Sequence, residues 1–249
     1  MIQTEHLTKR FGSLTAVNDL NLRIEQGEFF AFLGPNAAGK TTTIKLLAGL
    51  LKPTFGRALV GGYDIQEEPT KARRLISYVP DLPFLYDKLQ PMEFMLLVGR
   101  LYGMSRGEIL SASEELFDLL DVEDVGQQLI ENLSHGTRQR VAIASALLHN
   151  PKVIIIDEPM AGLDPRSVRA VKDLLKARAQ DGVTIFLSTH ILQIAEELAD
   201  RIGILNHGRL IAVGTMSELR EASGEVGALE DTFMALTDEE EREEAPESI

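Results

Sequence analysis

The chain has 249 residues, 44% of them hydrophobic, so it can form one large domain or a core domain with a subdomain. It contains no cysteine, which excludes disulfides and cysteine-based metal sites. The N-terminal residues are polar, and wholly apolar runs such as residues 153–156 are far shorter than the roughly 20 residues of a membrane span. We therefore expect a soluble, cytoplasmic chain.

The formal net charge is −13, and it is unevenly distributed. Residues 238–249 hold seven acids and one arginine, so this tail contributes −6 and the rest of the chain −7. An acidic body argues against broad binding to a nucleic-acid backbone, because such binding needs many basic contacts. We expect no nucleic-acid partner, although a nucleotide, which needs one local site, remains compatible.

The first half of the chain reads as strands followed by a strand–loop–helix unit. Residues 2–11 and 16–27 alternate in the manner of antiparallel strands. Residues 28–34 predict a buried strand, and residues 40–51 a helix in which Gly49 either lies inside or marks the end. Further strands are predicted at residues 56–65 and 75–80.

The second half begins with a helical region, because apolar residues recur at three-and-four spacing from Pro91 to about Val125 without a strand. Strands and helices then alternate, and the last element is a hairpin that turns at residues 206–208. These elements are a strand at 152–157, a helix at 165–180, a strand at 183–189, a helix at 191–200 and the hairpin at 201–214. The acidic end is expected to be disordered or a solvated helix end.

Residues Gly34 to Thr41, GPNAAGKT, fit the pattern G-x-x-x-x-G-K-[ST] between a predicted strand and a predicted helix. The glycines allow backbone N–H groups to surround phosphates, Lys40 reaches the β- and γ-phosphates, and Thr41 offers its hydroxyl to Mg²⁺. The alternative, a glycine-rich turn without a ligand, does not explain the lysine and threonine at these positions.

Asp157 and Glu158 follow an apolar strand. Carboxylates at the end of a buried strand are costly unless they bind metal or take part in chemistry. In P-loop enzymes the first acid helps to hold Mg²⁺, and Glu158 is placed to polarise an attacking water. The alternative is a strand end with exposed acids.

Three further features have both a functional and a structural interpretation. His190 follows a strand at the end where ligands bind in open α/β sheets, but a lone histidine can equally be structural. Phe11 can stack on a base or be an ordinary core aromatic. Ser134 and Gly136 lie at a predicted helix start, where they can bind a phosphate or, for Ser134, simply cap the helix.

Five motifs, in this order and at these spacings, resemble the ATP-binding subunit of an ABC transporter: GPNAAGKTT, LSHGTRQR, VIIIDEP, AGLDP and STH. The resemblance covers about residues 1–220. It implies an α/β P-loop NTPase (RecA-like) core with an N-terminal antiparallel β-subdomain and an inserted α-helical subdomain at about residues 84–140. Residues 221–249 would form a C-terminal extension. The segment YVPDLPFLYDKL resembles the exporter-type branch, and the acidic end resembles its Ecs-type members.

The resemblance also assigns roles to residues. Phe11 would stack on the adenine, Glu158 would be the catalytic base, and His190 would touch the γ-phosphate. Thr41, Asp157 and Asp81 would face Mg²⁺. Two subunits, expected to form a homodimer, would pack head to tail, so that Ser134 and Gly136 grip the ATP of the partner, and residues 162–164 would link the two sites. The ATP-contacting loop residues would be Gly34, Pro35, Asn36, Ala37, Ala38, Gly39, Lys40, Thr41 and Thr42.

Four positions depart from the family pattern. Ala37 stands where glycine is usual, and if this position needs a positive φ, the alanine costs about 1 kcal/mol. His135 and Thr137 replace the usual glycine and glutamine of the signature, whereas Gly136 is retained. Asp81 replaces a glutamine and adds a negative charge near ATP. These changes are expected to alter the ATP affinity and the ATP turnover rate, and they leave the resemblance to the family intact.

The expected function is ATP-driven closure of a dimer that drives a separate transmembrane permease in export, with ATP and Mg²⁺ as cofactors, at the inner face of the cell membrane. The apolar stretch at residues 82–95, beside Asp81, is the candidate docking surface; simple packing of the helical subdomain is the alternative. Two other functions remain: a soluble ABC ATPase that acts on a ribosomal or DNA complex, and an ATP-gated binding module without hydrolysis. The single cassette, the acidic charge and Glu158 with His190 argue against them.

Overall fold

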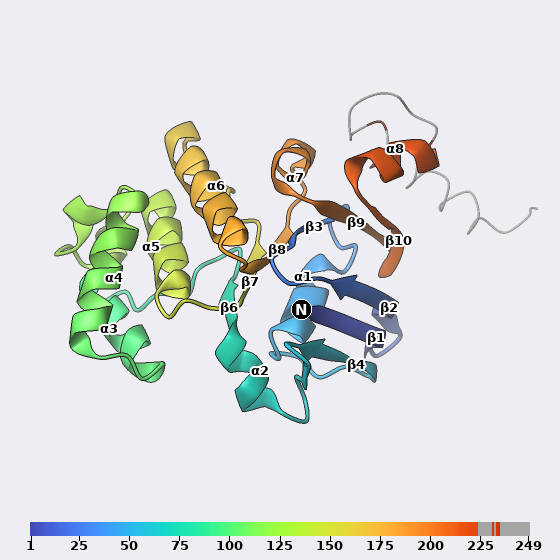
Figure 1. Ribbon diagram of the computed structural model, residues 1–249, viewed down its shortest axis with the longest axis horizontal. Helices are drawn as coiled ribbons and strands as arrows, with labels where there is room; N and C mark the ends of the chain where they lie inside the picture. Colours follow the sequence, from blue (N-terminus) through green and yellow to red (C-terminus); the bar gives the residue numbers. More distant parts are fainter. Residues whose placement is uncertain (224–230, 232, 235–249) are drawn as a thin grey trace, which may run out of the picture.

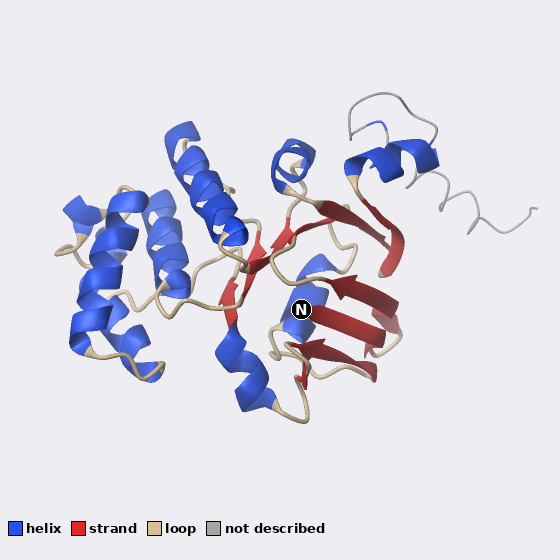
Figure 2. Cartoon of the chain, viewed as in Figure 1, coloured by secondary structure: helices blue, strands red, loops and turns tan. Residues whose placement is uncertain are grey.

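The structure is a computed structural model that describes residues 1–223, 231 and 233–234. Its elements form two sheets and a group of helices at one end of the molecule (Figure 1). The four-stranded sheet has the order β2-β1-β4-β5 and the six-stranded sheet the order β10-β9-β3-β8-β7-β6. Figure 2 shows the helical group at one side and the four-stranded sheet at the other, with the six-stranded sheet between them.

The four-stranded sheet is antiparallel, as predicted from the alternating N-terminal residues. It contains β1 (Ile2–Phe11), β2 (Leu14–Ile24), β4 (Phe55–Val60) and β5 (Tyr63–Asp64). One face of this sheet packs on the larger sheet, where the rings of Phe30, Phe32 and Phe186 meet at centroid distances between 5.2 and 6.5 Å. The two sheets therefore share an apolar core.

The six-stranded sheet is parallel except for its last strand, β10. Its strands are β3 (Phe29–Leu33), β6 (Ile76–Val79), β7 (Val153–Asp157), β8 (Thr184–Ser188), β9 (Arg201–Asn206) and β10 (Arg209–Gly214). Strands β3, β7 and β8 are buried along their whole length, which explains why each contains a continuous apolar run rather than alternating residues. Their carboxyl ends lie at one edge and position the candidate site.

Helices surround the larger sheet and form the separate group at one end. They are α1 (Lys40–Leu47), α2 (Pro69–Leu75), α3 (Pro91–Leu101), α4 (Arg106–Leu119), α5 (His135–Leu147), α6 (Pro165–Gln180), α7 (Leu192–Leu198) and α8 (Met216–Ser223), with short 3₁₀ turns at Glu123–Val125 and Ile130–Asn132. None of the helices described here is both long and apolar enough to cross a lipid bilayer.

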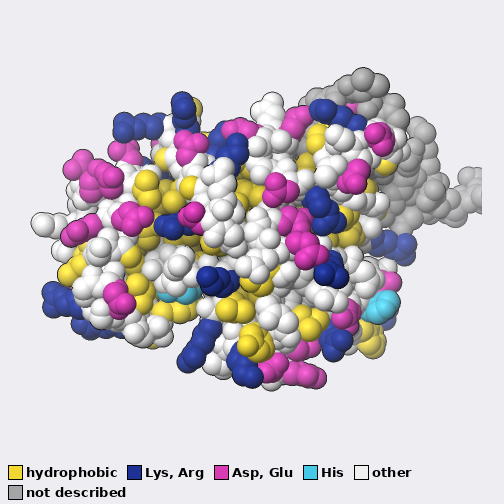
Figure 3. Space-filling view, in the orientation of Figure 1, with side chains coloured by type: hydrophobic (Ala, Val, Ile, Leu, Met, Phe, Trp, Pro, Cys, Tyr) yellow, Lys and Arg dark blue, Asp and Glu magenta, His cyan; other side chains and the backbone are white. Residues whose placement is uncertain are grey.

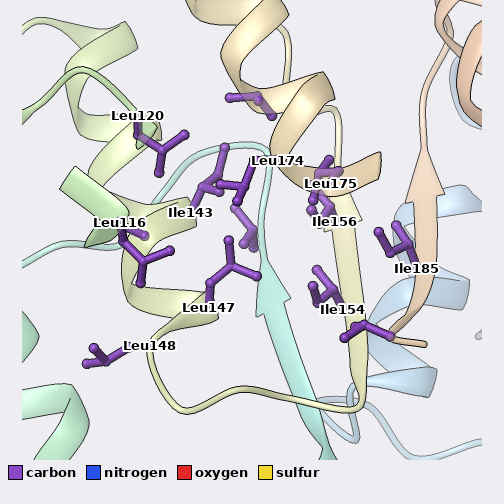
Figure 4. Packing of buried hydrophobic residues seen from close by; sticks show 14 of the residues in the cluster. Leu116, Leu120, Ile143, Leu147, Leu148, Ile154, Ile156, Leu174, Leu175 and Ile185 are labelled. Carbon is purple, nitrogen blue, oxygen red and sulfur yellow. The ribbon is translucent and has the colours of Figure 1, made fainter. Parts of the chain in front are cut away.

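The helical group shares a core with the central sheet. Leu116 of α4 and Leu147 of α5 lie toward Ile154 of β7, and Leu174 of α6 closes the same cluster (Figure 4). Each of these side chains is at least nine-tenths buried, and burying one contributes about 1.5–3 kcal/mol. Helix α5 therefore holds the helical group at a defined place relative to β7.

Two details settle or extend the sequence predictions. Helix α1 ends at Leu47, and Gly49 follows with a φ of 69°, so this glycine marks the helix end rather than its interior. Helix α2 was not predicted from the sequence, because Ala72 is the buried residue of this short helix and no apolar stripe exists. The boundary suggested at residue 220 falls within α8, and the acidic tail lies outside the described residues.

Candidate active site

The loop between β3 and α1 folds tightly around Lys40. Gly39 precedes the helix with a φ of 108°, a conformation that requires glycine. The Lys40 side chain is buried, and its Nζ donates to the carbonyl oxygens of Gly34 at 2.7 Å and Pro35 at 3.0 Å. Burial lowers the pKa of Lys40, and the negative charges of Glu158 and Asp157 oppose that effect. The ammonium group thus lies inside the loop, where phosphate oxygens can replace the two carbonyls.

Ala37 stands where the family usually has glycine, and its backbone adopts the strained conformation expected if that position needs a positive φ. Its φ is 66°, in the left-handed region. An L-residue with a side chain pays about 1 kcal/mol or more for this conformation. The loop therefore keeps the geometry of a glycine-rich phosphate loop, at a cost in stability that glycine would avoid.

Thr41 and Asp157 meet across the site although 116 residues separate them. The Thr41 hydroxyl donates to Asp157 Oδ2 at 2.9 Å, and Asp157 is almost fully buried at the end of β7. Asp81 lines the same cavity. Burial, and then the charges of Asp157 and Asp81, raise the pKa of Tyr78 to about 12, so this phenol stays neutral. Two carboxylates and a hydroxyl thus supply hard oxygen ligands.

These oxygens fit Mg²⁺ better than a metal held by protein alone. Among residues 1–223, no group of three or more histidine, cysteine or carboxylate side chains could hold a metal ion. Mg²⁺ usually takes one or two carboxylates and completes its octahedron with phosphates and water. The residues present therefore match an ion that arrives with a nucleotide.

Glu158 is held by residues from the end of β8. Its Oε1 lies 2.8 Å from His190 Nδ1, and the Thr189 hydroxyl donates to its Oε2 at 3.1 Å. Its backbone N–H donates to the Ser188 carbonyl at 2.9 Å, with a φ of 48° at Glu158. The strained backbone aims a carboxylate that is 16% exposed toward a histidine that is 58% exposed. A carboxylate and an imidazole in contact are the groups needed to orient and deprotonate a water.

Phe11 lines the same cavity. It is 47% exposed, which excludes the interpretation as a core aromatic, and Leu14 and Ala16 lie beside it. Lys9 Nζ lies 5.0 Å from the centre of the Phe11 ring. The ring therefore offers an open face within reach of the phosphate loop.

Ser134 and Gly136 do not line this cavity. Ser134 caps α5, and its Oγ accepts from the Thr137 N–H at 3.2 Å, as the structural interpretation predicted. Figure 1 shows α5 in the helical group and α1 in the centre of the molecule. The structure thus brings together the phosphate loop, Phe11, Asp81, Asp157 and Glu158, with His190 joined through Glu158, and leaves the signature segment outside.

Backbone contacts that the sequence did not reveal hold the phosphate loop in place. The Gly208 N–H, at the tip of the β9–β10 hairpin, donates to the Ala38 carbonyl at 2.8 Å. The Gly208 carbonyl accepts from the Asn18 N–H at 2.8 Å. A Cβ at Gly39 would lie 2.2 Å from the Ala16 carbonyl oxygen. The hairpin tip therefore connects the phosphate loop to β2, which carries Leu14 and Ala16 of the cavity wall.

We expect Gly208→Ala to weaken ATP binding, whereas Gly182→Ala does not. Both glycines have left-handed backbones, with φ of 81° and 84°, so alanine costs each about 1 kcal/mol of folding stability. A Cβ at Gly208 would also lie 3.0 Å from the Ala16 carbonyl oxygen, whereas one at Gly182 meets nothing within 4 Å. A displacement that costs about 1 kcal/mol at the site weakens binding about fivefold. ATP titrations and thermal denaturation test this, and equal ATP affinities would contradict it.

Comparison with known proteins agrees with this geometry. A family model described as ABC transporter matches residues 17–161. The linearmycin resistance ATP-binding protein LnrL of Bacillus subtilis (strain 168) is 35% identical to this chain, over 95% of the chain and 75% of that protein. The daunorubicin/doxorubicin resistance ATP-binding protein DrrA of Streptomyces peucetius is 39% identical, over 90% of the chain and 68% of that protein.

Solved structures show the same fold. One described as the ATP-binding subunit of an ABC transporter has a TM-score of 0.90 and 33% identity, over 95% of this chain and 99% of that one. A dimeric ATP-binding cassette, solved in a post-hydrolysis state with ADP and Pi bound, has a TM-score of 0.80 and 30% identity, over 87% of this chain and 99% of that one. The predicted fold class is confirmed.

Proposed function

Because the chain belongs to the ABC transporter family, as an ATP-binding and ATP-hydrolysing subunit, we propose that two such subunits close on ATP and drive a separate membrane subunit in export. The observation that carries the dimer is the position of the signature segment. Its capped helix start offers free N–H groups, yet Ser134 and Gly136 lie outside the cavity that holds the phosphate loop. A second copy, expected to be identical, can bring this segment to the ATP.

The proposed chemistry assigns one task to each group in the cavity. Lys40 and the backbone N–H groups of the loop neutralise the β- and γ-phosphates. Glu158 accepts a proton from the attacking water, and His190, in contact with Glu158, orients that water toward the γ-phosphate. Phe11 stacks on the adenine. Mg²⁺, held by Thr41 with Asp157 and Asp81 facing it, would supply charge neutralisation at the phosphates.

The partner in the membrane would dock in an apolar groove beside the ATP site. The groove is lined by Leu50, Leu82, Phe84 and Phe94, and it shares Thr41, Asp81 and Asp157 with the ATP cavity. Phe84 is 95% exposed and Leu82 69%, an unusual exposure for large apolar side chains that lie together. A subunit bound here would contact Asp81 and sense the nucleotide. This position would hold the chain at the inner face of the membrane.

The apolar groove also argues against the alternative function considered from the sequence. An ATPase that acts on a ribosomal or DNA complex needs a basic surface, whereas the groove offers leucine and phenylalanine side chains in a chain of net charge −13. Export is supported by the names of the relatives, which are resistance proteins.

The combined substitution Leu82→Ser and Phe84→Ser should release the chain from the membrane subunit and leave its basal ATPase activity intact. Loss of two buried apolar side chains at an interface weakens association by at least about tenfold. The fraction of the chain that co-purifies with the membrane subunit from detergent-solubilised native membranes measures this. Leu119→Ser, at an exposed leucine outside the groove, is the control. Unchanged co-purification of the double variant would contradict the docking site.

A further inference from the structure

A second cleft lies at the other end of the strands from the ATP site. It opens between α2 and the end of α3 and is lined by Thr70, Arg73, Arg74, Arg100, Tyr102 and His149, among others. Arg73 and Arg74 precede β6, and His149 precedes β7. The cleft is therefore at the amino ends of these parallel strands, whereas Asp81 and Asp157 follow their carboxyl ends. Neither the phosphate chemistry nor the apolar groove uses it.

Three arginines and no carboxylate line this cleft, in a chain whose net charge is −13. Arg74 and Arg100 form no ion pair with any carboxylate of the described chain, and Arg73 Nη2 donates to the Gly49 carbonyl at 2.8 Å. Several other surface arginines are paired, among them Arg57 with Glu5 and Arg166 with Asp121. Figure 3 shows lysine and arginine side chains on both sides of the notch between the helical group and α2.

Helix dipoles reduce the positive potential but do not cancel it. Helices α2, α3 and α5 all end beside this cleft, and each carboxyl end carries about half a negative charge. Three positive charges come from the side chains of Arg73, Arg74 and Arg100. The three arginines therefore exceed the negative charge of the three helix ends by about one and a half positive charges.

The wall of the cleft holds an unsatisfied polar atom. The His149 ring stacks on Tyr102, with ring centres 3.5 Å apart and planes inclined by 12°. Burial lowers the pKa of His149 to about 4, so the ring is neutral at pH 7 and adds no charge. Its Nδ1 is buried without a hydrogen-bond partner in this structure.

We propose that this cleft binds a phosphate group. Guanidinium groups match the planar pairs of oxygens on phosphate, and three of them exceed what one carboxylate can engage. Arg74 and Arg100 would contact the oxygens from opposite walls, Arg73 would add a third donor group, and the Thr70 hydroxyl would complete the shell. Leu101, exposed at the rim, suits either an open cleft or the apolar part of a phospholipid. The phosphate can be free or part of a lipid headgroup.

Inorganic phosphate and lipid vesicles test the proposal on the full chain, with its ATP site saturated by ADP. Phosphate should shift the NMR signal of the His149 ring, assigned with His149→Gln. The combined change Arg74→Gln and Arg100→Gln should weaken this response at least about tenfold. Vesicles that contain phosphatidylglycerol should bind the native chain better than pure phosphatidylcholine vesicles if the source is a lipid.

The control pair, Arg106→Gln and Arg169→Gln, removes the same charge from exposed arginines outside the cleft. A phosphate response that Arg74 and Arg100 control, without vesicle preference, identifies free phosphate. Vesicle binding that these two arginines control, without a response to free phosphate, identifies a lipid headgroup. If neither probe binds, or if the control pair loses as much binding as the cleft pair, the proposal is wrong.

Discussion

Glu158→Gln is expected to lower ATP turnover by about 10² or more and to leave ATP binding intact. Glutamine has the size of glutamate and still accepts a hydrogen bond from the Thr189 hydroxyl, which donates to Glu158 at 3.1 Å. It cannot take a proton from water at neutral pH. Binding survives because Lys40 and the phosphate loop are unchanged. Steady-state hydrolysis and equilibrium ATP binding measure the two effects separately.

The variant should also accumulate as an ATP-bound dimer, which size-exclusion chromatography with ATP detects. Glu131→Gln is the matched control, because Glu131 pairs with Lys88 at 2.6 Å on the surface of the helical group and should not affect turnover. Near-normal hydrolysis by Glu158→Gln would show that another group deprotonates the water. The left-handed backbone at Glu158, with its φ of 48°, would then need a different explanation.

Local patterns in the sequence were sufficient for most elements and for the residue types of the site. The structure confirms the strands β3, β7 and β8, predicted from apolar runs, and the helices α3 and α4, predicted from the three-and-four spacing of apolar residues. Both patterns depend only on residues that are close in the chain. The pairing of Thr41 with Asp157 followed from motif chemistry rather than from any local pattern. The exposure of Phe11, by contrast, depends on how two sheets pack, so the sequence left its role open.

The sequence could not reveal contacts made by the backbone alone. The Gly208 N–H reaches Ala38 through a hairpin whose turn looks like many others, and nothing in the motif predicts which carbonyl it meets. Helix α2 lacks an apolar stripe, and therefore the cleft that its arginines form with Arg100 was invisible as well. Such features depend on the approach of distant segments, which periodicity does not encode.

Two inactive variants should restore an intact ATP site when they are mixed, if the signature segment acts on the partner's ATP. Lys40→Ala removes the lysine of the phosphate loop. Gly136→Asp places a negative charge where the γ-phosphate of the partner should bind, so like charges repel. A Cβ at Gly136 would lie 3.3 Å from the flexible end of the Leu163 side chain, which has to shift by only a few tenths of an ångström, so we expect the variant to fold. Each variant alone should be inactive, since every site of its dimer carries one defect.

If the signature acts in trans, on the ATP bound by the other subunit, one site of the mixed dimer combines both defects. The other takes its phosphate loop from the Gly136→Asp chain and its signature from the Lys40→Ala chain, and both are intact. If the signature acts in cis, on the ATP of its own subunit, no site is intact. Gly107→Asp is the matched control, because Gly107 and Gly136 are each the second residue of a serine-capped helix and a Cβ at Gly107 meets nothing within 4 Å. It should be fully active.

The measurement is occlusion of ATP, with hydrolysis as a second readout, in mixtures whose mixed dimers have been quantified. One intact site should occlude up to one ATP per mixed dimer, whereas the separate variants occlude none. Hydrolysis follows only if one closed site can act without the other, so occlusion is the decisive quantity. Mixed dimers that form and occlude no ATP would contradict the head-to-tail arrangement. Recovery would explain why Ser134 and Gly136 lie outside the cavity that Lys40 and Thr41 line: the start of α5 is built for the nucleotide of the second copy.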